Sequence, residues 1–113
     1  MKNIYLRKLT SLVCYNDRAI VWPMVKYYFH YTVLEMLNNL ILSKFDKDFG
    51  FKTLEEAHVF IKENDVERER WVDFCVSMAT DWNKALCSDK FSEDDYIQVE
   101  HMLPMMQRLY LSL

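Results

Sequence analysis

The amino-acid sequence predicts an all-α fold, a single-domain helical bundle of four to six helices with a long central apolar helix. The chain has one glycine and two prolines, and sheet-rich folds need more turn positions with positive φ than these supply. Its 113 residues suffice for one hydrophobic core, so we expect one domain over residues 1–113. Apolar residues make up 51% and charged residues 27%, a balance typical of chains that fold.

The first half of the chain predicts two helices. Residues 3–15 place apolar side chains near helical spacing, although their β-branched and aromatic residues leave a strand open as the alternative. Asn16 and Asp17 can then cap a long apolar helix over residues 18–44, with Pro23 near its start or at a kink. Apolar residues cover most of the circumference of this second segment, so we expect it to be the central helix.

The clearest break lies at residues 45–51, which are polar and hold the only glycine. The sequence Thr53-Leu54-Glu55-Glu56 that follows matches a capping box. We therefore expect a short helix from Leu54 to about Lys62, with Leu54, Ala57 and Ile61 facing inward. Asn64 and Asp65 can then cap the next helix.

Two further helices complete the bundle. In the first, apolar residues recur at steps of three and four and predict its buried face: Trp71, Phe74, Cys75, Met78, Ala79, Trp82, Ala85 and Leu86. After a break at residues 88–90, Ser92 can cap a last helix from Glu93 to about Leu111, which Pro104 should kink or restart. The methionines Met102, Met105 and Met106 either fill the core or form a plastic docking surface, and core is the favoured interpretation.

Charged residues are unevenly distributed along the chain. Residues 1–45 hold six basic and two acidic side chains, whereas residues 46–113 hold eight basic and fifteen acidic ones. The acids crowd two expected helix starts: Glu63, Asp65, Glu67 and Glu69 at one, and Asp89, Glu93, Asp94 and Asp95 at the other. Neighbouring helix starts of this kind would attract a basic partner. The alternative is that acids in a first helical turn only stabilise their helices.

Other features exclude several classes of protein. Cys14, Cys75 and Cys87 are odd in number and lack Cys-x-x-Cys spacing, which predicts reduced, buried thiols of a cytoplasmic protein. We expect no signal peptide and no membrane span, because the most apolar segment carries Lys26 and Glu35 among other polar residues.

The charge balance also disfavours direct nucleic-acid binding. A sequence pI of about 5.6 opposes the electrostatic term that dominates such affinity. The exception is a basic segment with aromatic residues interleaved, which leaves a nucleic-acid contact open: Lys2, Arg7, Lys8 and Arg18.

No catalytic or metal-binding motif is present, so we expect no enzyme activity, no cofactor and no metal. Glu55 and His58 form a single Glu-x-x-His, which di-iron carboxylate bundles carry twice, and a metal site would need further ligands such as His30 or His101. The expected role of His30 is that of a buried, hydrogen-bonded side chain. The aromatic run from Trp22 to Tyr31 holds more rings than one inward stripe can hide, so some of its tyrosines should reach the surface.

In size, helicity, acid balance and lack of catalytic motifs, the chain resembles the small helical immunity proteins, of the contact-dependent inhibition or bacteriocin type, that bacteria keep in the cytosol to neutralise a toxin. The resemblance covers the whole chain without a signature motif, and residues 63–73 and 89–95 carry it. It implies a one-to-one inhibitor of a basic, nuclease-type toxin domain. The expected polar contacts to this partner are Glu67, Glu69, Asp73, Glu93, Asp94 and Asp95.

A second interpretation is a helical regulatory or scaffolding protein that oligomerises through its aromatic and Met-rich faces, and a third is an enzyme with a non-obvious helical site. The sequence leaves the oligomeric state and the identity of the partner open.

Overall fold

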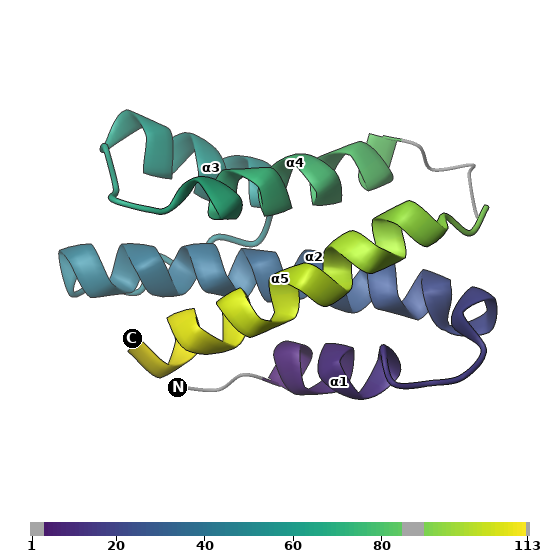
Figure 1. The fold of residues 1–113 in the computed structure, drawn as a ribbon. Helices are drawn as coiled ribbons and strands as arrows, with labels where there is room; N and C mark the ends of the chain where they lie inside the picture. Colours follow the sequence, from purple (N-terminus) through teal and green to yellow (C-terminus); the bar gives the residue numbers. More distant parts are fainter. Residues whose placement is uncertain (1–3, 85–89, 113) are drawn as a thin grey trace.

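The computed structural model describes residues 4–84 and 90–112, which form five α-helices and no strand. The helices are α1 (Ile4–Leu12), α2 (Arg18–Phe45), α3 (Leu54–Glu63), α4 (Arg70–Lys84) and α5 (Glu93–Ser112). In Figure 1, α2 runs through the middle of the bundle, α1 lies below it, α3 and α4 lie above it, and α5 crosses in front. The predicted all-α bundle is confirmed, and its first segment is a helix rather than a strand.

The central helix α2 has a defined cap at each end. The Asp17 carboxylate accepts a hydrogen bond from the Ile20 backbone N–H at 3.2 Å and caps the start, as predicted. The helix ends where Asp46 adopts a left-handed conformation with φ of 53°. Helices α1, α3, α4 and α5 all pack on α2, so its buried side chains point in several directions: Val21, Trp22, Val25, Phe29, Thr32, Val33, Leu34, Met36, Leu37 and Ile41.

Hydrogen bonds from α2 fix the connection to α3. The Asn38 side chain accepts from the Phe51 N–H at 3.0 Å and donates to the Phe51 carbonyl at 2.9 Å. Thr53 then caps α3, because its hydroxyl accepts from the Glu56 N–H at 3.2 Å. The predicted inward residues of α3, Leu54, Ala57 and Ile61, are all buried.

The prediction that Asn64 and Asp65 cap the next helix is wrong. These residues instead end α3 in a Schellman-type turn: Asp65 takes a φ of 50°, and the Val66 N–H bonds to the Ile61 carbonyl at 3.0 Å. Val66 is buried and anchors the connection to the core. Helix α4 consequently begins only at Arg70.

The buried face of α4 is centred on Val72, Cys75, Val76 and Ala79, one step from the predicted stripe. Trp71, Met78 and Trp82 are half-buried at its edge, and Phe74 is 45% exposed. The prediction gave weight to large side chains, whereas the smaller valines occupy the centre, where the helix lies nearest to its neighbours. The predicted inward residues Ala85 and Leu86 lie outside the described residues.

Helix α5 starts at the predicted serine cap, since the Ser92 hydroxyl accepts from the Asp95 N–H at 3.3 Å. It continues through Pro104 as one helix. Met102 and Met106 are buried and Met105 is partly buried, which confirms the core interpretation. No helix in the described ranges combines the length and hydropathy required to cross a bilayer.

The cysteines differ in their surroundings. Cys75 is buried, as predicted, but Cys14 is exposed because it follows the last turn of α1, where its thiol lies 3.4 Å from the Thr10 carbonyl. The third cysteine, Cys87, lies outside the described residues.

Candidate functional site

The predicted acidic residues near α4 precede the helix or make contacts within the chain. Glu67 and Glu69 lie in the connection before α4, so the prediction that they occupy its first turn is wrong, and Asp73 alone supplies an acid there. The Asp73 carboxylate accepts from Arg68 Nε at 2.8 Å, and the Glu69 carboxylate accepts from the Trp71 indole. Only Glu67 of the three has no such contact among the described residues.

At the start of α5, too, two of the three predicted acidic residues make contacts within the chain and one does not. Glu93 pairs with Arg18, whose other nitrogen lies 3.6 Å from Glu100. Asp95 accepts from the Trp82 indole at 3.2 Å. Asp94 is exposed and, within the described part of the chain, has no side-chain partner.

The two acidic groups lie at opposite ends of the bundle, which corrects the expectation that their helix starts are neighbours. Figure 1 shows α4 and α5 running in opposite directions. Glu67 accordingly borders a hollow with Arg108 near the end of α5, whereas Asp95 borders another with Asp81 near the end of α4. Consecutive helices joined by a short connection run antiparallel, so the starts of α4 and α5 are separated by about the length of a helix.

A third acidic group, absent from the predicted site, lies on the outward face of α3. Glu55, Glu56 and Glu63 line a shallow hollow of about 390 Å³ together with apolar side chains, among them Val59 and Phe60. None of the three carboxylates has an ion pair or side-chain hydrogen bond within residues 4–84 and 90–112. The hollow therefore combines an apolar floor with carboxylates that make no ion pair among the described residues, while Lys44 and Lys47 lie over the rings of Phe45 and Phe49 in the same cluster.

The apolar floor belongs to a cluster of four phenylalanines between α2 and α3. Phe60 is 4.8 Å from Phe49, 5.2 Å from Phe51 and 5.4 Å from Phe45 between ring centroids. Val59 is 45% exposed beside them. Mutual packing of the rings holds this surface in place.

The sequence contained a signal for this face. Glu55, Glu56, Val59, Phe60 and Glu63 follow steps of one, three and four, which place them together on a helix opposite the buried residues of α3. In the sequence, Glu55 and Glu56 are part of a capping box and Glu55 is part of a Glu-x-x-His, but neither was predicted to belong to a binding surface. The contribution of Phe51 could not be predicted, because it depends on the path of the loop before α3.

Two histidines, His30 and His58, are half-buried. His58 Nε2 on α3 lies 3.5 Å from Asp73 Oδ1 on α4, and burial, assisted by Lys62, lowers the pKa of His58 despite the carboxylate. Burial also lowers the pKa of His30, and its Nδ1 has no hydrogen-bond partner among the described residues, which differs from the expected hydrogen-bonded side chain. In the described part of the chain, no three His, Cys, Asp or Glu side chains are grouped to hold a metal ion.

No protein-family model, curated protein or solved structure matches this chain.

Proposed function

We propose that this protein acts by binding another protein, as a one-to-one immunity-type inhibitor of a basic, nuclease-type toxin domain. The observation that carries the proposal is the hollow on α3, where Glu55, Glu56 and Glu63 surround exposed Val59 and half-buried Phe60. An apolar centre with a polar rim is the usual composition of a protein interface. Carboxylates in the rim would steer a basic partner toward the hollow.

This surface replaces most of the predicted contact residues in the proposal. Asp73, Glu69, Glu93 and Asp95 already accept hydrogen bonds or pair within the chain, so binding a partner through them would compete with those contacts. Glu67 remains a candidate contact on the same end of the bundle as α3. Asp94, at the other end, would contribute only to the long-range field.

The test begins with co-purification of the tagged protein from its native host, followed by identification of the partner and titration of its activity. We expect a basic partner whose activity is abolished at a one-to-one ratio. Neutralising the α3 rim with Glu55→Gln, Glu56→Gln and Glu63→Gln should lower the association rate constant by about tenfold and reduce its dependence on salt.

The matched control neutralises the first turn of α5 with Glu93→Gln, Asp94→Asn and Asp95→Asn. It removes the same number of charges, but at the other end of the molecule. Circular dichroism and thermal unfolding establish that both triple variants are folded. An association rate that falls in the α5 variant and not in the α3 variant would contradict the proposed surface, and a partner that keeps its activity in the complex would contradict inhibition.

A specific observation also favours the second interpretation, a protein that oligomerises through aromatic residues. Tyr27 and Met24 on α2 are 53% and 46% exposed, and a large apolar area open to water often marks a contact surface. Of the α5 methionines, Met102 and Met106 are buried, which leaves only the partly buried Met105 for such a surface.

A further inference from the structure

One face of α2 is buried along half of its length and bare along the other half. Ile20, Tyr27, Leu34 and Ile41 are spaced by seven residues and so lie on one side of the helix. Their exposed fractions fall along the chain from 71% and 53% to 8% and 0%. The same side of the helix therefore changes from open surface to core near its middle.

Helix α3 and the loop before it cover the buried half. Asn38, one turn after Leu34 on this side of α2, is joined to Phe51 by two hydrogen bonds, and α3 packs on α2 directly afterwards. In Figure 1, α3 lies over the half of α2 that is nearer to its C-terminal end. Within residues 4–84 and 90–112, no helix or loop covers the other half in this way.

The bare half has the composition of a contact surface. Every exposed residue of α2 from Ala19 to Tyr27 is uncharged: Ala19, Ile20, Pro23, Met24 and Tyr27. The solvent face of a helix normally carries charged and polar side chains. Tyr31 continues this surface, where its ring stacks on Tyr5 of α1 at 5.3 Å.

We propose that a second copy of this chain covers the bare half of α2 with the outward face of its own α3. The bare stretch from Ile20 to Tyr31 is about 17 Å long at the rise of an α-helix. Helix α3, with ten residues, is about 15 Å long. The α3 of one copy therefore has about the length of the bare stretch of α2 that lies beside the α3 of the other copy.

The charges at the two surfaces are complementary. The α3 face carries Glu55, Glu56 and Glu63 around its apolar centre. On the bare side, α2 carries no acidic residue from Arg18 to Leu34, and Tyr27 and Tyr31 border a hollow there. Lys8 follows Tyr5 by about one turn on α1 and is exposed. The acidic rim of α3 thus meets a side of the partner that has an exposed lysine on α1 and no acidic residue on this stretch of α2.

The arrangement closes with two-fold symmetry. When two copies face each other with their α2 helices antiparallel, each α3 packs on the bare half of α2 in the other copy. The same contact then forms twice. Such a reciprocal interface gives a dimer and leaves no free end for further growth. The dimer does not rest on the proposed inhibitor function. If both hold, a toxin and a second copy compete for the α3 face.

Sedimentation velocity of the purified protein over a wide concentration range tests the dimer without any partner. We expect a reversible monomer–dimer equilibrium. Tyr27→Glu on the bare face and Val59→Arg on α3 should each raise the dimer dissociation constant by about tenfold or more, because each damages both copies of the contact. Both positions are about half exposed, so the variants should fold. Asp94→Arg, at the start of α5, is the control that leaves the equilibrium unchanged.

Mixing the two single-face variants provides the decisive measurement. A mixed dimer contains one unaltered contact and one in which the introduced charges are opposite, so an equimolar mixture should dimerise more tightly than either variant alone. A wild-type protein that stays monomeric at all concentrations would overturn the proposal. A dimer that persists in Val59→Arg but not in Tyr27→Glu would also overturn it, since the bare faces of α2 would then pack on each other.

Discussion

The two cysteines in the described ranges have opposite chemical environments. Cys75 lies in the core, and burial raises the pKa of its thiol to about 12. Cys14 is exposed at the end of α1. Because only the thiolate reacts, the burial of Cys75 protects it twice, through access and through ionisation.

We therefore predict that a thiol-specific alkylating reagent modifies Cys14 in the native protein and Cys75 only after unfolding. The measurement is mass spectrometry of peptides after timed alkylation in a Cys87→Ser background, with and without denaturant. Equal rates at Cys14 and Cys75 in the native protein would contradict the position of α4 in the core.

Contacts between side chains distant in sequence decide which carboxylates are free. Arg18 at the start of α2 pairs with Glu93 at the start of α5, and Trp82 donates to Asp95 from the preceding helix. Nothing in the local sequence around Glu93 or Asp95 predicts these partners. The sequence could therefore predict that the later half of the chain is acidic, but not which of its acids remain available to another molecule.

The bare and covered halves of α2 provide a matched pair of isoleucines for a stability test. Ile20 and Ile41 lie on the same side of the same helix but are 71% and 0% exposed. Ile41→Ala should lower the free energy of unfolding by about 2–5 kcal/mol, because it removes buried methyl groups and leaves a cavity. Ile20→Ala should change it by less than about 0.5 kcal/mol.

Urea unfolding of dilute protein measures both variants under conditions that favour the monomer. A similar loss of unfolding free energy in the two variants would mean that Ile20 is covered in the monomer. This would contradict the bare half of α2.

Helix ends were predictable where the capping signal is local. Asp17, Thr53 and Ser92 all act as the sequence predicted, because the cap and the amide that it accepts from lie within three residues. The start of α4 was not predictable in this way, since Asn64 and Asp65 suit either the end of one helix or the start of the next. Burial of Val66, a tertiary contact, decides between them.

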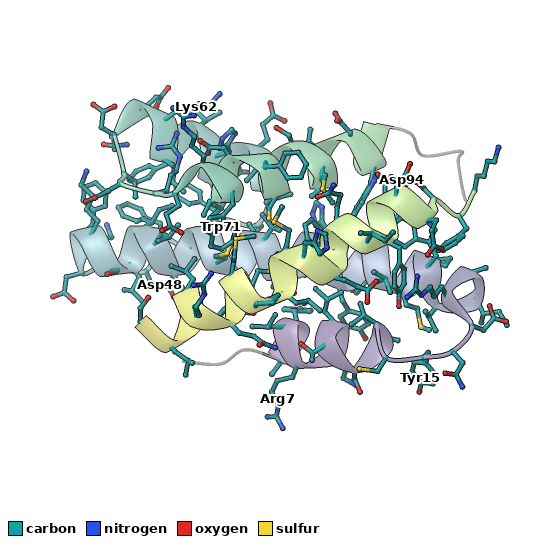
Figure 2. The ribbon with its side chains drawn as sticks, viewed as in Figure 1. Arg7, Tyr15, Asp48, Lys62, Trp71 and Asp94 are labelled. Atoms are coloured by element: carbon teal, nitrogen blue, oxygen red, sulfur yellow. The ribbon has the colours of Figure 1, made fainter. Side chains whose placement is uncertain are left out.

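The orientation of the helices explains why the predicted acidic site does not assemble. Lys62, at the end of α3, and Asp94, at the start of α5, lie at opposite ends of the molecule in Figure 2. The alternation of helix direction in a bundle with short connections already implied this separation. The alternation of helix direction does not determine the position of α3. That position follows from the hydrogen bonds between Asn38 and Phe51, and it brings the carboxylates of Glu55 and Glu63 to one hollow.

The stability of the whole molecule should depend on pH through its two shielded histidines. Burial is the main cause that lowers the pKa of both His30 and His58 below the ordinary value of 6.5. For His58, Lys62 and Arg68 lower the pKa further, and Asp73 opposes them. Near and below pH 6.5 the unfolded chain then binds more protons than the native protein, so the free energy of unfolding falls as the pH drops through this value.

We predict that wild-type protein loses stability between about pH 7.5 and about pH 5.5, and that a double variant His30→Gln, His58→Gln loses less over this interval. Urea unfolding at each pH provides the measurement. Glu35 acts in the opposite direction, because burial raises its pKa above 4.5 and favours the native state on acidification. Glu35 is present in both proteins, so its effect cancels in the difference between them. An identical loss of unfolding free energy in the two proteins would show that His30 and His58 bind protons as readily in the folded state as in the unfolded chain. It would contradict the close packing of α3 on α4 around His58.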